Sequence, residues 1–293
     1  MITIREVKTE RDRRIFSDFP NRLYKDVPQY MPPLSADDRG DWNPKKNPAF
    51  AYCDVKAFLA EKDGKVVGRV GAILNHRANE KWHTNRMRFS QLDFIDDPEV
   101  SDALFKAVED FAREKGCDSV HGPLGFTDLD REGMLVEGFD QKSMFITYYN
   151  YPYYIQHLER LGYAKDVDWV EFLVDVPKDP RLIDRLGKLS ERVLAHNRLH
   201  VAEIKRRRDF QPYVEKVFRL WNTAYAPLYG TTTLDDTQVK RYVKKFLPMI
   251  DPRLACFVMD EQDELAAFGV SAPSIASALK KSNGRLFPFG FVG

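Results

Sequence analysis

Apolar and polar residues alternate over residues 2–7, the period-two pattern of a half-buried strand. Ile15, Phe19 and Leu23 then recur at helical spacing, which predicts a helix directly after the strand. Residues 28–48 are rich in proline, with Asp, Asn and Gly between the prolines. That composition predicts a long irregular excursion, which we expect Tyr30 and Trp42 to anchor.

Two β-rich runs, residues 55–60 and 66–74, flank a short loop that ends in Gly64. This arrangement predicts a β-hairpin. Arg69 interrupts the second run, which is otherwise the most apolar stretch of the chain. Residues 88–95 alternate closely enough to predict a third strand.

A helix is predicted to begin at Asp97 and Pro98, because an aspartate suits the N-cap and a proline the first turn. Apolar residues then recur at helical spacing until Gly116 ends the pattern. The rest of this region is predicted to form a short buried strand, a tyrosine-rich helix and a last strand, at residues 119–122, 152–161 and 169–176.

The C-terminal part of the chain repeats the N-terminal pattern. Residues 201–205 match residues 4–8, and a second hairpin is predicted at residues 254–259 and 265–270. In the same register the last segment, residues 285–292, falls on the strand at residues 88–95. We therefore expect an N-terminal lobe at residues 1–178, a linker helix at residues 179–199 and a partial second lobe at residues 200–293.

The segment ALFKAVEDFAREKGCDSV, residues 103–120, is similar to the central helix and following strand of the GNAT acyl-CoA N-acyltransferase superfamily. Leu161-Gly162-Tyr163 resembles the Leu-Gly-Phe that ends a later helix in that family. The resemblance covers residues 1–176 and, less completely, residues 201–292. Within the superfamily, the sequence most resembles uncharacterised bacterial tandem GNAT-like proteins. It implies an α/β fold (α+β mixed sheet), a GNAT-like lobe followed by a second, incomplete GNAT-like lobe.

The resemblance implies transfer of an acyl group from acyl-CoA or acetyl-CoA to an amine, with the coenzyme pyrophosphate on backbone N–H groups at a helix start. The family's glycine-rich loop is missing from residues 96–102, which carry four carboxylates instead. Carboxylates repel a diphosphate, so we expect a degenerate first lobe and coenzyme binding outside it. The matching helix of the second lobe falls beyond Gly293, and we expect the chain to be an inactive fragment.

In that family a tyrosine serves as the general acid, and Leu158 occupies the corresponding position here. Tyr154 and His157 lie one turn or less away and are therefore the candidate catalytic residues. Candidate substrate-binding residues lie in an acidic, glycine-containing loop after a strand end and in a run of five tyrosines within residues 148–154. They are His121, Asp140, Tyr149, Asn150 and Tyr153. A solvated loop and packing aromatics are the open alternatives.

Lys plus Arg (45) nearly balance Asp plus Glu (44), so the net charge of +1 argues against DNA, tRNA and an anionic membrane as partners. A Fem-like transfer from aminoacyl-tRNA is disfavoured for the same reason. The three cysteines lack metal-ligand spacing, and the charged N-terminus is unlike a secretory signal. We expect a cytoplasmic protein without a metal.

The incomplete second sheet predicts self-association through its exposed edge. The alternative to an N-acyltransferase is a non-catalytic GNAT-like module that binds a small molecule or a protein.

Overall fold

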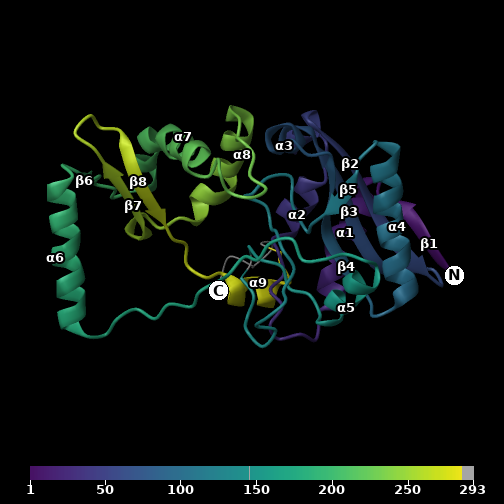
Figure 1. Ribbon diagram of the computed structural model, residues 1–293. Helices are drawn as coiled ribbons and strands as arrows, with labels where there is room; N and C mark the ends of the chain where they lie inside the picture. The colour runs from purple at the N-terminus through teal and green to yellow at the C-terminus, as the bar shows by residue number, and fades with distance from the viewer. Residues whose placement is uncertain (145, 286–293) are drawn as a thin grey trace. The chain divides into compact units, whose positions relative to one another are not determined.

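The computed structural model describes residues 1–144 and 146–285, which divide into two compact units (Figure 1). Unit 1 consists of Met1–Asp168, Gly230–Thr232 and the residues from Ser274 onward. Unit 2 consists of Trp169–Tyr229 and Thr233–Pro273. The two short additions to unit 1 come from sequence positions that the predicted lobes assign to the second half.

A five-stranded sheet in the order β1-β2-β3-β4-β5 organises unit 1. β1, β2, β3 and β4 pair as antiparallel neighbours, and β4 pairs with β5 in parallel. The sheet is therefore mixed, as the resemblance implies. The strands are β1 (Ile2–Glu6), β2 (Cys53–Lys62), β3 (Lys65–Asn75), β4 (Arg86–Phe94) and β5 (Ser119–His121).

β4 contains one extra residue that changes which side chains face each side of the sheet. The register shifts between Arg69 and Gly71 of β3, and Gln91 of β4 has a positive φ of 45°. A bulge of one residue reverses the alternation beyond it. Phe89 and Leu92, three positions apart, consequently belong to the same core cluster.

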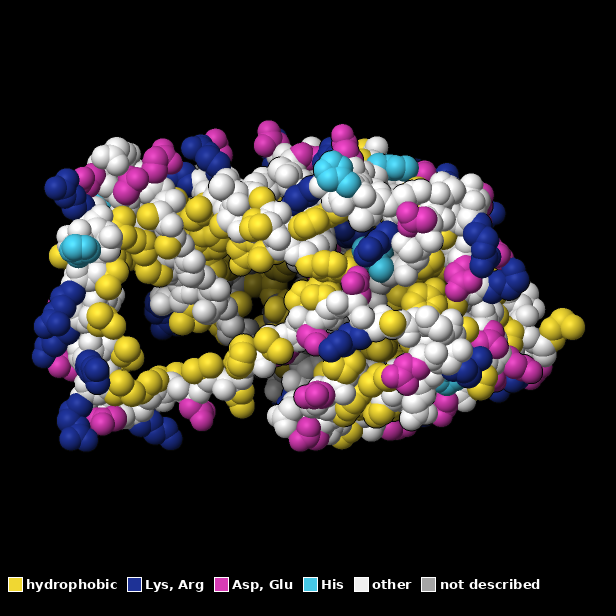
Figure 2. Space-filling model, in the orientation of Figure 1, with side chains coloured by type: hydrophobic (Ala, Val, Ile, Leu, Met, Phe, Trp, Pro, Cys, Tyr) yellow, Lys and Arg dark blue, Asp and Glu magenta, His cyan; other side chains and the backbone are white. Residues whose placement is uncertain are grey.

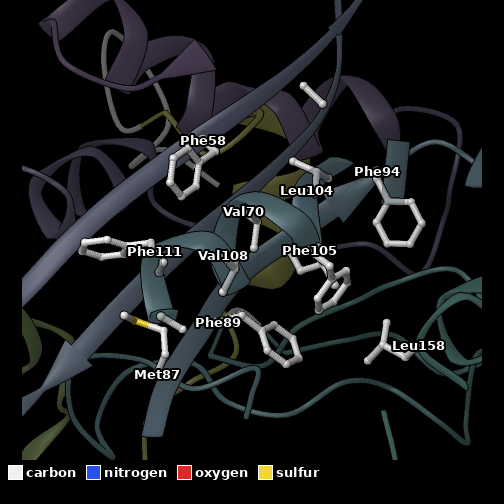
Figure 3. Packing of buried hydrophobic residues seen from close by; sticks show 14 of the residues in the cluster. Phe58, Val70, Met87, Phe89, Phe94, Leu104, Phe105, Val108, Phe111 and Leu158 are labelled. Atoms are coloured by element: carbon white, nitrogen blue, oxygen red, sulfur yellow. The ribbon is translucent and has the colours of Figure 1, made fainter. Parts of the chain in front are cut away.

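Helices cover both faces of this sheet. α4 (Pro98–Glu114) packs on one face and encloses the larger core. Asp97 caps its N-terminus and Pro98 occupies its first turn, as predicted. Figure 3 shows the packed side chains, among them Phe58, Val70, Met87, Phe89, Phe94, Leu104, Phe105 and Val108.

On the other face lie α1 (Glu10–Leu23) and α2 (Ser35–Asp41), with Phe16 and Trp42 in the second core cluster. Thr9 and Asp12 form a capping box that fixes the start of α1. α2 lies within the predicted irregular excursion, where Tyr30 and Trp42 are buried as expected. The remaining helices of unit 1 are η1 (Pro48–Ala51), α3 (His76–Trp82), α5 (Tyr153–Arg160) and α9 (Ala276–Ser282).

Unit 2 holds a three-stranded antiparallel sheet in the order β6-β7-β8. It repeats the β1-β2-β3 arrangement, and α7 packs against it beside a small core around Phe257. Its elements are α6 (Pro180–His196), β6 (His200–Val201), η2 (Arg207–Tyr213), α7 (Val214–Ala224), α8 (Asp236–Phe246), η3 (Leu247–Met249), η4 (Pro252–Leu254), β7 (Ala255–Met259) and β8 (Leu265–Val270).

The predicted strand at residues 169–176 is wrong. These residues have no strand partner, and Phe172, Leu173 and Val174 are each at least 79% exposed. The segment is rich in β-branched and aromatic residues, but a strand forms only where a neighbouring strand accepts its hydrogen bonds. The predicted strand at residues 285–292 lies outside the described residues except for Arg285.

Candidate functional site

β4 and β5 separate partway along the sheet of unit 1. They pair only from Arg86 with Ser119 to Arg88 with His121. Gly122 then turns the chain across β4 at a φ of 148°, and a Cβ there would lie 2.3 Å from the Phe89 carbonyl oxygen. Only glycine fits this crossing. β4 continues to Phe94 beyond its last pair with β5, and we call this unpaired edge of β4, residues 89–94, the notch.

Tyrosines of α5 fill the end of this notch. Ile95 N–H donates to Val67 of β3, so the N–H and C=O of the preceding Phe94 point to the opposite side, away from β3. The Phe94 N–H donates to the Tyr154 hydroxyl at 2.9 Å, and the Tyr153 hydroxyl donates to the Phe94 carbonyl at 2.5 Å. Both backbone groups of Phe94 are therefore used within the protein.

The Tyr154 hydroxyl belongs to a directional chain of hydrogen bonds. Tyr24 donates to Asp93 at 2.8 Å, so its oxygen accepts the proton of Tyr154, 2.7 Å away. Burial raises the pKa of both phenols, with Asp93 adding to the effect. The Tyr154 proton is directed into the interior of unit 1.

Asp93 continues into a buried ionic network on the side of the sheet opposite α4. Arg69 Nε lies 2.7 Å from Asp93 Oδ2, and both side chains are almost completely buried. Arg69 also lies 3.6 Å from Asp38, which accepts from Gln91 and from Arg131. Burial alone lowers the pKa of Arg69, but the two carboxylates raise it above its ordinary value, so the guanidinium is charged.

The start of α4 presents no unused backbone donor. Pro98 has no N–H, and the Glu99 N–H donates to the Asp97 side chain at 3.0 Å. The N–H groups of Val100 and Ser101 both donate to the Asp97 carbonyl, at 3.0 and 3.2 Å. An anion at a helix start is held by such N–H groups, so these residues do not fit a pyrophosphate.

Side chains of α5 also close the start of α4. His157 Nδ1 lies 2.8 Å from the Ser101 hydroxyl and Nε2 lies 2.9 Å from Asp96. Arg160 lies 2.9 Å from the same hydroxyl and 2.5 Å from Asp102. Ser101 is fully buried, so this Ser–His–Asp arrangement has no exposed nucleophile and instead joins the two helices.

The loop after β5 contains a buried carboxyl group. Glu132 Oε1 has no hydrogen-bond partner among the described residues, and burial raises the pKa of this side chain to about 8. Asp128 and Asp130 add to the rise, whereas Arg88 opposes it. At neutral pH Glu132 is therefore largely protonated. His121, at the end of β5, is held neutral, because burial lowers its pKa to about 4.

The structure brings only some of the predicted site residues together. Tyr153, Tyr154 and His157 all contact the Phe94 ring, and Tyr149 packs edge-on against Tyr24. Asn150 instead holds the loop, since its side-chain amide exchanges hydrogen bonds with the backbone of Leu135. Asp140 is exposed and accepts from Gln141. The catalytic and substrate-binding roles stay predictions.

The buried network around Arg69 was not predicted as a unit. Its signal in the sequence was a single arginine inside an apolar β run, since a charge in such a run requires a buried partner. The partner positions, Asp38, Asp93 and Arg131, come from three separate segments. No group of His, Cys, Asp and Glu able to hold a metal occurs in the part of the chain that the structure describes.

From β1 to α5, unit 1 has the element order that the GNAT resemblance implies, and unit 2 repeats its first part. The fold is thus that of a GNAT-like lobe followed by a partial second one. No family model matches the sequence. The chain is 28% identical over 292 residues to Protein YghO of Escherichia coli (strain K12), covering 99% of this chain and 73% of that protein.

A second relative is similar over the same extent. The chain is 28% identical over 297 residues to the Bacterial ceramide synthase of Caulobacter vibrioides, covering 99% of this chain and 75% of that protein. Among solved structures, a tandem GNAT protein from the clavulanic acid biosynthesis pathway has a TM-score of 0.47 at 14% identity, over 92% of this chain and 73% of that one. An aminoglycoside acetyltransferase from a soil metagenomic sample has a TM-score of 0.38 at 14% identity, over 60% and 97%.

Proposed function

We propose that this protein is an acyltransferase that moves an acyl group from a coenzyme A thioester to an amine. The observation that carries the proposal is the 28% identity, along 99% of the chain, with a protein named as a ceramide synthase. A ceramide is a long-chain amine that bears an acyl group in amide linkage. We therefore propose a long-chain amine as the acceptor class.

The reaction needs a neutral amine and a proton for the leaving group. The amine nitrogen attacks the thioester carbonyl, the C–S bond breaks, an amide forms and coenzyme A leaves as the thiol. The proton lost by the amine balances the proton gained by the thiolate, so no other reactant is consumed.

Unit 1 serves as scaffold in this proposal, and acyl-CoA binds outside it. Two features support this placement. The first four positions of α4 offer no N–H to a diphosphate. Both backbone groups of Phe94 in the notch are bonded to Tyr153 and Tyr154.

The test is direct. The protein is incubated with a long-chain acyl-CoA and a long-chain amine, and the amide is measured by mass spectrometry beside the released thiol. Omission of the amine is the control for simple thioester hydrolysis. Amide formed in equal amount to the thiol supports the proposal, whereas thiol release that does not depend on the amine contradicts it.

A second candidate is a non-catalytic module that binds a ligand or a protein. The filled notch and the closed start of α4 favour it, because a module has no need for an open thioester site. Calorimetry separates the two candidates. Binding of a long-chain amine without any binding of acyl-CoA, and without amide formation, identifies the module.

A further inference from the structure

A long apolar surface of unit 2 is exposed, formed by residues 169–176 and by α6. Trp169 is 51% exposed, Phe172 is 82% and Leu173 is 94%. On α6 no residue is buried, and five of its large apolar side chains are 42–55% exposed: Leu182, Ile183, Leu186, Leu189 and Val193. Figure 2 shows hydrophobic side chains along this segment and along one side of α6, with Lys and Arg on its other side.

Two parallel rows of side chains run along α6. Leu182, Leu186, Leu189 and Val193 recur at intervals of four, three and four residues, which places them in one row on a helix. A basic residue directly precedes each of them, so the basic residues form a second row about 100° round the helix. The members of the basic row are Arg181, Arg185, Lys188 and Arg192.

The acidic residues of α6 lie elsewhere. At 3.6 residues per turn, Asp184 and Glu191 fall on the side roughly opposite the apolar row. Lys188 pairs with Asp184 at 2.7 Å, and Arg181 pairs with Asp179 at 3.2 Å. Within the described ranges, Arg185 and Arg192 have no ion pair. The flank of the apolar row therefore carries unneutralised positive charge, although the whole chain is nearly neutral.

We propose that α6 and residues 169–176 form a surface that binds an anionic lipid bilayer. In a bilayer interface the negative headgroups lie in a layer directly above the apolar chains. A helix that lies in this interface needs an apolar row with a basic row on its flank and acids directed to water, which is the arrangement of α6. The apolar row extends over about 16 Å of helix, from the eleven steps of about 1.5 Å between Leu182 and Val193.

Protein partners fit this surface less well. A second copy that paired antiparallel through the apolar row would bring the two basic rows to the same side of the pair, and like charges side by side disfavour association. The exposed Trp169 agrees with an interfacial position, because tryptophan favours the boundary between water and lipid.

The expectation of no membrane partner rested on the net charge of the whole chain. No helix in residues 1–144 or 146–285 is long and apolar enough to cross a bilayer. Neither criterion concerns a helix that lies flat in the interface, where a local basic row acts within a Debye length. The proposal does not depend on the acyltransferase activity.

Cosedimentation with vesicles tests it. The full chain is mixed with vesicles of phosphatidylglycerol and phosphatidylcholine or of phosphatidylcholine alone. We expect the protein to sediment with the anionic vesicles and at least about tenfold more weakly with the neutral ones. Arg185→Glu with Arg192→Glu should weaken binding to the anionic vesicles at least about tenfold.

The matched control is Arg206→Glu with Arg208→Glu, which changes the net charge equally at exposed positions of η2 and the residue before it. This variant should still bind. Leu186→Gln with Leu189→Gln should lose binding while its circular dichroism spectrum stays that of the parent. Absence of parent binding, equal losses in both charge variants, or retained binding in the leucine variant would each overturn the proposal. A dimer that only the leucine variant disrupts, without vesicle binding, would also overturn it and identify a subunit interface.

Discussion

The hydroxyl oxygens of Tyr24 and Tyr154 lie 2.7 Å apart in the interior of unit 1. The Tyr24 hydroxyl donates a hydrogen bond to Asp93, so between the two hydroxyls Tyr154 is the donor. The chain of hydrogen bonds thus runs from the backbone of β4 through two phenols to a carboxylate that Arg69 neutralises. In this position the Tyr154 hydroxyl stabilises the fold through its bonds to the backbone of β4 and to Tyr24.

Tyr154→Phe should destabilise unit 1 by about 1–3 kcal/mol, because the buried Phe94 N–H loses its acceptor. Urea denaturation followed by circular dichroism measures the loss. Tyr151→Phe is the control, since its hydroxyl makes only a 3.3 Å bond to Leu23, and it should cost less than about 1 kcal/mol. Equal losses in the two variants would contradict the directional chain.

Arg69→Met should cost about 3–5 kcal/mol, because it leaves the Asp93 and Asp38 carboxylates buried without their cation. Lys106→Met removes an exposed pair with Asp110 and should change the free energy of unfolding by less than about 1 kcal/mol. Combining Arg69→Met with Asp93→Leu should restore part of the loss. A double variant less stable than Arg69→Met alone would show that Arg69→Met does not leave Asp93 as an unpaired buried charge.

Glu132 makes stability depend on pH in a defined direction. Its pKa is raised to about 8 in the folded state, so the folded state binds more protons than the unfolded one between the two pKa values. The free energy of unfolding should fall as pH rises through this window, by up to about 1.4 kcal/mol per pH unit. Glu132→Gln should raise the melting temperature at pH 8.5 and leave it nearly unchanged at pH 4.5. Identical shifts at both pH values would refute the assignment.

His157→Gln decides whether unit 1 carries chemistry. If α5 only closes the start of α4, the variant should keep its turnover and lose about 1 kcal/mol of stability, with the bonds to Ser101 and Asp96. The measurement is amide formation under saturating substrates. Loss of a general acid costs about 100-fold or more, so a fall of that size in a folded variant would place the reaction at α5.

Local signals predicted most elements of unit 1. The hairpin of β2 and β3 follows from two apolar runs around a glycine turn, and α4 follows from its cap, its proline and its spacing. The strand predicted at residues 169–176 has a similar content of β-branched and aromatic residues. This prediction was wrong because a strand needs a neighbouring strand to pair with, and the local sequence does not show whether one is present.

The candidate site was less predictable, because its geometry depends on contacts between distant segments. The five tyrosines of residues 148–154 indicated more rings than one buried face can hold, yet none of the five is exposed. Tyr153 and Tyr154 bond to the backbone of β4, about sixty positions earlier in the chain. The residue types alone showed that the start of α4 is rich in acids. That His157 and Arg160 cover it could not be predicted, because this depends on where α5 packs.

Because of the bulge at Gln91, the side of the sheet that each β4 side chain faces depends on the number of residues in the strand. Removal of that residue would turn Asp93 toward the apolar core beneath α4 and would direct Phe94 at Arg69 on the opposite side. Deletion of this one residue would therefore place a charged side chain in the apolar core and an apolar side chain in the ionic network. The midpoint of β4 therefore does not tolerate the loss of a single residue.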